Sequence, residues 1–167
     1  MPSAATPPET EFEIARVERS IHVDAPVDDV WPSVAEPDEL SVWLGGEVEL
    51  DRPIGPGAAG ELREPDGSVR HLLVTDHEPG RRLAWHWWRD GEELSSVEIT
   101  VRPDGEGTEV RVVEVVALAA ATAGGGRAFS SASGPLDGIS AMERSWASAL
   151  PALASRLSRK LCPTVLA

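Results

Sequence analysis

The sequence of 167 residues predicts an α+β fold, in which a seven-stranded antiparallel sheet wraps around one long C-terminal helix. Three observations lead to this prediction. Seven segments alternate apolar and polar residues between turns that are rich in Gly, Pro and Asp. Two short helical segments follow the first of these strands, and a long apolar stripe at helical spacing lies near the C-terminus. Because such a sheet and such a helix each present an apolar face, the two must be buried against each other.

The N-terminal part of the chain predicts one strand and two short helices. Residues 17–23 alternate apolar and polar side chains, as expected of a half-buried strand. Pro26 suits the first turn of a helix, because proline has no backbone N–H to lose there. Pro37 precedes a second short helix, which is expected over residues 38–44 and is ended by a pair of glycines.

Six further strands are expected in succession. They are residues 47–51, 60–64, 69–77, 83–88, 97–101 and 108–118. Short turns containing Pro-Asp-Gly, Pro-Gly or Gly-Glu-Gly separate several of them, and such turns join antiparallel neighbours. With the first strand, the sequence therefore predicts a long antiparallel meander of seven strands.

One apolar stripe predicts the long C-terminal helix. Its members recur every three or four residues and are Ile139, Met142, Trp146, Leu150, Leu153, Leu157 and Leu161. A stripe of this length can lie across a sheet. Residues 119–138, which precede it, are rich in Ala, Gly and Ser and predict a flexible loop at the mouth of any pocket between sheet and helix. Residues 1–14 are expected to form a flexible tail, which leaves a single domain over residues 15–162.

The charge and cysteine content exclude several classes of protein. A formal net charge of −13 disfavours any partner with a phosphate backbone, so no nucleic acid is expected. No run of about 18 apolar residues is present, so no membrane span is expected. The lone Cys162 cannot form an internal disulfide and fits a reducing cytoplasm, which the absence of a secretory signal also favours. The four histidines lack the spacing of a metal motif, and we expect neither a metal nor a cofactor.

Several phrases of the sequence occur in a characteristic order. They include Ala25-Pro-Val-Asp-Asp-Val-Trp-Pro32, Glu78-Pro-Gly-Arg-Arg-Leu-Ala-Trp-His-Trp87, and residues 36–44, 48–51, 97–108 and 110–114. In order and spacing they resemble the START-like or SRPBCC superfamily, which includes polyketide-cyclase-like proteins. Within it, the chain is similar to bacterial homologues of the heat-shock-protein-90 ATPase activator. The resemblance covers about residues 15–118 and implies the helix-grip fold, with two short helices after the first strand.

The resemblance does not imply a ligand, because the chain departs from the family pattern near the expected pocket mouth. The loop 119–138 is unusually rich in small residues, and Ser145-Trp146 stands where many relatives have Gly-Trp. The family has no shared set of catalytic residues, so the fold alone does not give a function.

Strand parity predicts which side chains face the helix. Trp85 and Trp87 share one face of their strand, and Glu114 shares an apolar face with its neighbours at positions 110, 112 and 116. A carboxylate among apolar residues is costly unless it is paired. Glu114 is therefore expected either to orient a polar ligand group or act as an acid or base, or else to form a structural salt bridge or lie near the open end of the cavity. The candidate ligand-binding residues are Trp43, Trp85, Trp87, Glu114, Met142 and Trp146.

Three functions follow from these residues and from the resemblance. The first is binding of a small lipophilic or aromatic molecule in an apolar cavity, in a stress or regulatory setting. The second is a polyketide cyclase or aromatase-like enzyme that uses Glu114 as acid or base, although catalysis is the less favoured alternative. The third, implied only by the family name, is a chaperone ATPase activator-like module that binds another protein. The chain is expected to be a monomer or a homodimer.

Overall fold

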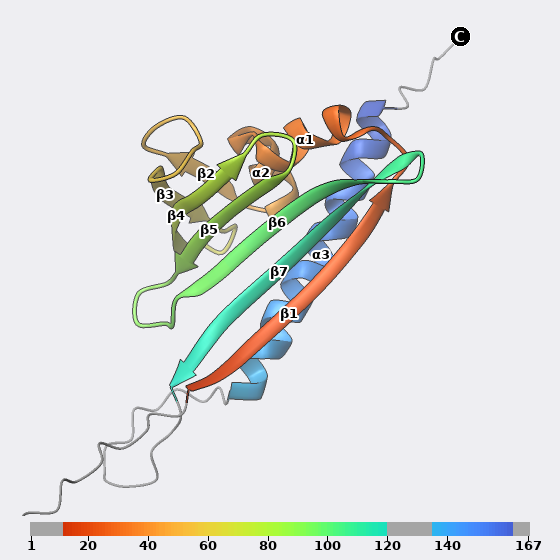
Figure 1. Cartoon of the computed structure of the whole chain (residues 1–167). Helices are drawn as coiled ribbons and strands as arrows, with labels where there is room; N and C mark the ends of the chain where they lie inside the picture. Colours follow the sequence, from red (N-terminus) through yellow and green to blue (C-terminus); the bar gives the residue numbers. More distant parts are fainter. Residues whose placement is uncertain (1–11, 120–134, 162–167) are drawn as a thin grey trace, which may run out of the picture.

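The computed structural model describes residues 12–119 and 135–161. Figure 1 shows one curved sheet with a long helix lying across one of its faces. The elements are β1 (Phe12–Val23), α1 (Val27–Ala35), α2 (Pro37–Leu44), β2 (Glu47–Leu50), β3 (Ala59–Arg63), β4 (Val69–Glu78), β5 (Arg82–Trp88), β6 (Ser95–Asp104), β7 (Gly107–Ala119) and α3 (Pro135–Leu161).

The seven strands form a single antiparallel sheet in the order β1-β7-β6-β5-β4-β3-β2. Strands β2 to β7 follow one another as a meander, and β1 joins the sheet beside the last strand. The predicted fold class and the order of its elements are therefore confirmed.

Two predicted boundaries were wrong. Residues 12–14, expected in the tail, belong to β1, because Phe12 to Ala15 continue the pairing with the end of β7. Ala119 and residues 135–138, expected in the flexible loop 119–138, belong to β7 and α3. The rest of that loop, the rest of the tail and Cys162 lie outside the described residues.

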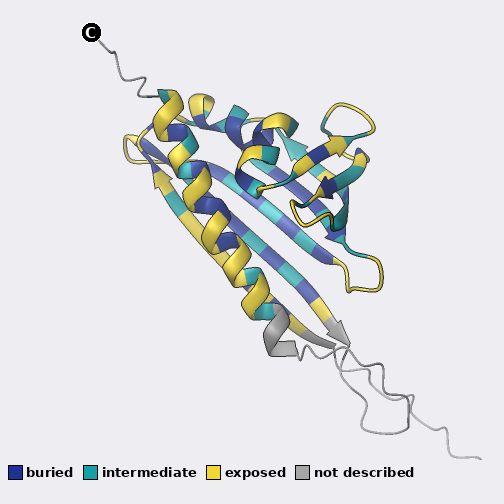
Figure 2. Ribbon diagram, turned by 180° about the vertical axis from the view of Figure 1, so that it is seen from behind, coloured by how far each residue is buried: buried dark blue, intermediate teal, exposed yellow. Residues whose placement is uncertain are grey.

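The concave face of the sheet holds the core, together with one side of α3. Figure 2 shows buried residues along the inner side of that helix and on the sheet face that it covers. The predicted stripe is confirmed, since Trp146, Leu150, Leu153 and Leu157 are buried, whereas its outer members Ile139, Met142 and Leu161 are half-buried. Helix α3 packs mainly against β1 and α2.

Strand β4 shows a parity that the sequence left open. Leu72 and Val74 are buried on the concave face, and His71 and Leu73 are half-buried on the other face. The pairing of β4 with β5 shifts register between Val74 and Asp76, so one extra residue bulges out of the strand. Counting alternate residues across this bulge would therefore assign the residues after Val74 to the wrong face of the sheet.

Helix α2 is tied to α3 by charge. The two carboxylate oxygens of Glu39 accept hydrogen bonds from Arg156, at 3.1 Å each, and Lys160 Nζ lies 3.3 Å from one of them. The Glu39 side chain is only 11% exposed. The hydrogen bond from Arg156, together with Lys160, holds the pKa of Glu39 below its usual range despite burial.

We expect Glu39→Gln to lower the free energy of unfolding by about 1–3 kcal/mol at pH 7, because bonds to a charged acceptor are lost. Since the folded-state pKa is depressed, this contribution is present above the unfolded-state value of 4.5 and is lost as pH falls through the folded-state pKa. Urea denaturation of both proteins across this range measures it, with the exposed Glu47→Gln as control. A difference that stays constant down to the most acid pH would contradict the charge-based explanation.

Candidate functional site

Four tryptophans from three elements meet between the sheet and the helices. Trp85 and Trp87 come from β5, Trp43 from α2 and Trp146 from α3, and all are 1–3% exposed. The Trp87 and Trp146 rings stack, with centroids 5.7 Å apart and an interplanar angle of 23°. Trp43 lies 6.3 Å from Trp146, and Trp85 meets Trp87 edge-on at 5.7 Å. We call these four residues the tryptophan cluster.

Glu114 binds two members of the tryptophan cluster. Its Oε1 accepts a hydrogen bond from Trp87 Nε1 at 2.8 Å, and its Oε2 accepts one from Trp146 Nε1 at 2.7 Å. The residue is 2% exposed. Each oxygen therefore accepts one indole N–H, and the two bonds fix the orientation of the carboxylate.

The sheet register explains how Glu114 reaches this position. Across the strands, Trp85 pairs with Val97, and Val97 pairs with Glu114. These three residues therefore form one row on the concave face. The next row contains Trp87 and Ser95, so the Trp87 indole can reach the Glu114 carboxylate diagonally across the sheet.

Met142, the last of the predicted site residues, lies at the margin of this arrangement. It is half-buried and packs against the core one turn before Trp146 on α3. The structure therefore brings five of the six predicted residues into one contact network, and places Met142 on the same face of α3.

An apolar cavity lies on the α2 side of Trp85. Its volume is about 10 Å³. Its lining contains no polar side chain other than the indole of Trp85 and consists of Leu40, Leu44, Val48, Leu50, Ile54, Leu72, Val74, Leu83 and Trp85. Within residues 12–119 and 135–161, the buried Trp85 Nε1 has no hydrogen-bond acceptor, whereas Trp43 Nε1 donates to the Ser33 carbonyl oxygen at 3.0 Å.

A group of charged residues on the concave face was not predicted from the sequence. The Arg70 guanidinium lies 4.2 Å from the centroid of the Trp87 ring, and the Arg70 side chain is only 16% exposed. Beside it, Glu64 accepts a hydrogen bond from Arg89. Arg70 lies two and four residues before the buried Leu72 and Val74, so it faces the same side of β4. This spacing could have identified Arg70 as a residue of the concave face.

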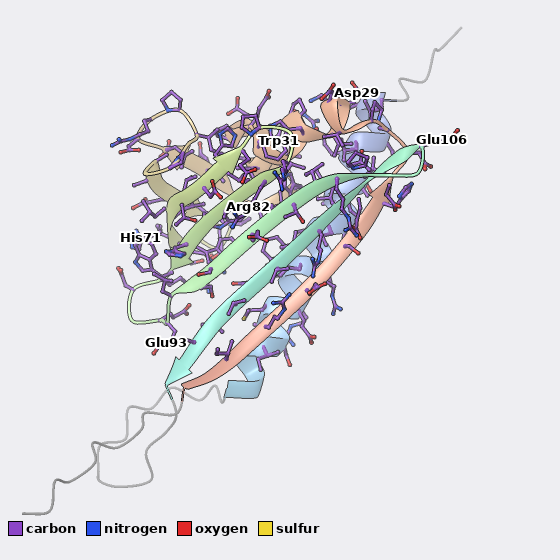
Figure 3. The ribbon with its side chains drawn as sticks, viewed as in Figure 1. Asp29, Trp31, His71, Arg82, Glu93 and Glu106 are labelled. Atoms are coloured by element: carbon purple, nitrogen blue, oxygen red, sulfur yellow. The ribbon has the colours of Figure 1, made fainter. Side chains whose placement is uncertain are left out.

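The convex face carries conventional surface charge. Figure 3 shows His71 and Arg82 on the side of the sheet away from α3. Arg82 pairs with Asp76 at 2.8 Å and Glu98 at 2.7 Å, and His71 Nε2 lies 3.1 Å from Asp90. Such exposed pairs contribute little to stability. In the described part of the chain, no three His, Cys, Asp or Glu residues are grouped so that they could hold a metal ion.

The family assignment rests on a match that spans most of the chain. The family model described as polyketide cyclase / dehydrase and lipid transport matches residues 15–157. The chain belongs to this family. The resemblance to START-like, polyketide-cyclase-like proteins is thereby confirmed, whereas the closer similarity to heat-shock-protein-90 ATPase activator homologues stays a prediction. No match was found among curated proteins.

Solved structures show the same helix-grip fold. DynU16, described as a putative protein in the dynemicin biosynthetic locus, is 25% identical with a TM-score of 0.67 over 87% of this chain. The chain spans about half of DynU16, 48% of its length. CalU16 from Micromonospora echinospora is 22% identical with a TM-score of 0.64, covering 93% of this chain and 90% of CalU16. SA2116 from Staphylococcus aureus is 14% identical with a TM-score of 0.68, covering 90% and 98%.

A membrane-spanning role finds no support in the helices of the structure. None of those within the described ranges has a stretch that is both long enough and apolar enough to cross a bilayer. Helix α3 is long, but its outward side is charged and exposed.

Proposed function

We propose that this polyketide cyclase / dehydrase and lipid transport family member binds a small lipophilic or aromatic molecule between the concave face of its sheet and helices α2 and α3. The observation that carries the proposal is the apolar cavity beside Trp85, whose indole N–H is buried without an acceptor. An apolar lining with one or two convergent polar groups is typical of small-molecule sites. The family description, which includes lipid transport, supports the same class of ligand.

The cavity must enlarge to admit a ligand. A volume of about 10 Å³ holds no more than one water molecule, whereas even benzene needs a cavity of roughly 150 Å³. The wall opposite the sheet is formed by Leu40 and Leu44 of α2. Since α2 has only eight residues and is followed by Gly45 and Gly46, we propose that it moves outward when the ligand enters. The ion pairs of Glu39 with α3 oppose this movement.

The Trp85 N–H is fully buried in the closed cavity, and we propose that it becomes the directional contact only when the cavity opens. A ligand oxygen or nitrogen that accepts this hydrogen bond would remove the cost of an unsatisfied buried donor, roughly 1–3 kcal/mol. The stacked Trp87 and Trp146 rings would form the opposite boundary of the ligand site. Trp43, Met142 and Glu114 complete the proposed lining or hold it in place.

The test is a titration with the neutral fluorescent probe N-phenyl-1-naphthylamine. We expect saturable binding to the wild-type chain, and Leu44→Phe should weaken it about 10-fold or more because the added ring fills the cavity. Val42→Phe introduces the same side chain on the exposed side of α2 and should leave binding unchanged. The proposal fails if the wild type does not bind the probe, or if both variants bind it equally well.

Catalysis is a second candidate because Glu114 is an ionisable group inside the tryptophan cluster. A cyclase-like reaction would use this carboxylate as acid or base. If Glu114→Gln folds, retains ligand binding and loses all turnover of an identified substrate, catalysis by Glu114 is supported. Unchanged turnover would remove it. The chaperone-related alternative stays a prediction, for which a pull-down with a purified chaperone is the test.

A further inference from the structure

Arg70 is held in an unusual position for a cation. It lies on the concave face of β4, and its guanidinium covers the Trp87 ring at 4.2 Å from the centroid. Trp87 is itself fixed by its hydrogen bond to Glu114 and by stacking on Trp146. A cation above an indole ring is attracted by the electron-rich face, and the attraction strengthens when water is excluded. The guanidinium therefore has a defined place at the edge of the tryptophan cluster.

The guanidinium of Arg70 also lacks a close acceptor. In the part of the chain that the structure describes, it donates no hydrogen bond, and the nearest carboxylate oxygen is Glu64 Oε1 at 3.7 Å. Glu64 Oε2 already accepts hydrogen bonds from Ser68 and Arg89. An arginine presents five donors in a planar fork, so Arg70 holds most of its bonding capacity in reserve.

Arg89 adds a second cation beside Glu64, with one donor that is buried and, within the described ranges, unpaired. Its Nε is fully buried and, among the described residues, has no acceptor, although another nitrogen of the group bonds Glu64. No nitrogen of Arg70 is among these fully buried unpaired atoms, so water reaches its guanidinium. Burial, and then the neighbouring Arg89 cation, lower the pKa of Arg70 despite the nearby carboxylates. An added anion would offset the repulsion between the two cations.

The position of Arg70 relative to the cavity completes the geometry. Leu72, two residues further along the same face of β4, lines the cavity. The spacing of two residues along a strand is roughly 7 Å. A ligand whose ring enters the apolar cavity could therefore extend an anionic group to the edge where Arg70 and Arg89 lie.

We propose that Arg70 and Arg89 form an anion subsite and that the natural ligand is an aromatic acid, with a carboxylate or a comparable anionic oxygen group bound by the Arg70 guanidinium. This inference rests on the proposed function, since it assigns a chemical class to the molecule bound there. It also explains how a chain with a net charge of −13 can bind an anion. A local, partly buried cation acts at short range, where solvent screening is weak.

The test compares two probes that share one ring system. 8-Anilinonaphthalene-1-sulfonate carries an anionic group, and N-phenyl-1-naphthylamine lacks it. Both are titrated into the full chain by probe fluorescence at about 0.3 M salt, where long-range charge effects are screened. The wild type should bind the sulfonate more tightly. Arg70→Met should weaken sulfonate binding about 10-fold or more and change the neutral probe less than about 2-fold.

A matched control separates a subsite from net charge. Arg63→Met, on the neighbouring strand, removes the same charge from an exposed position and should alter neither affinity. Equal loss of sulfonate binding in both variants would overturn the proposal. The proposal would also be overturned if the wild type did not prefer the sulfonate, or if Arg70→Met kept the preference. In both cases, binding of the neutral probe would leave the proposed function intact. If neither probe binds the wild type, the proposed function and the subsite both fail.

A second variant covers the case in which Arg70→Met does not fold, as judged by its thermal unfolding. Arg70→Lys keeps the charge but loses the planar fork. Loss of about 3-fold or more in sulfonate affinity with unchanged neutral-probe affinity would support the subsite, since one bond of a bidentate pair is missing. An unchanged preference for the sulfonate would overturn the role of the guanidinium.

Discussion

Trp146→Ala is expected to lower the free energy of unfolding by about 5 kcal/mol, the upper end of the range for buried Trp truncations. The substitution removes a fully buried ring that stacks on Trp87 and contacts Trp43. It also removes the donor to Glu114 Oε2, which leaves a buried carboxylate oxygen without its partner. Urea denaturation monitored by circular dichroism measures the change.

A second variant isolates the lost hydrogen bond, and a third serves as a control for the loss of a tryptophan. Trp146→Phe keeps most of the ring but loses the N–H, so it should cost about 1–3 kcal/mol. Trp88→Ala, on the half-buried outward side of β5, should cost clearly less than Trp146→Ala. If Trp146→Ala were as stable as the wild type, the tryptophan cluster would be a loosely packed pocket wall, and our description of it as packed core would be wrong.

Glu114→Gln is expected to lower the free energy of unfolding by about 2–4 kcal/mol, although the side chain keeps its shape. The carboxylate accepts from two indole N–H groups at once. An amide has only one acceptor oxygen, so its NH₂ group must face one of the two indole donors. The amide NH₂ group and the indole N–H group would then face each other, and neither would have an acceptor. Thermal and urea denaturation measure the loss.

The control is Glu109→Gln on the same strand. Glu109 pairs with Arg102 near the surface, and loss of such a pair should cost no more than about 1 kcal/mol. Equal effects of the two substitutions would show that the cost is generic to β7. An unaltered stability of Glu114→Gln would show that the two indole N–H groups find other acceptors.

Strand and helix periodicity predicted most of the site. Alternation along β5 and β7 placed Trp85, Trp87 and Glu114 on the concave face, and the helical stripe placed Trp146 toward them. These predictions depend only on which side of an element a residue occupies. Long elements with one apolar face determine that reliably.

The partners of the charged groups could not be predicted in this way. Whether two indole N–H groups reach Glu114 depends on rotamers and on the distance between helix and sheet, which periodicity does not contain. Arg70 was missed because residues 71–74 are apolar on both parities and a bulge follows them. The near-closure of the cavity is likewise a result of side-chain packing, which depends on volumes summed over several elements.

The place of β1 in the sheet has a consequence for how the chain folds. Its partner is the last strand, so Phe12 pairs with Ala119 and Val23 with Thr108. Strands β2 to β7 can pair with sequence neighbours as they leave the ribosome, but β1 must wait until β7 has been synthesised. Such non-local pairing slows folding, because a long loop is ordered before its contacts are gained. During that interval the backbone edge of β1 is unpaired, and its apolar side, which includes Ala15 and Val17, stays uncovered until α3 has also been made, so the nascent chain is exposed to aggregation.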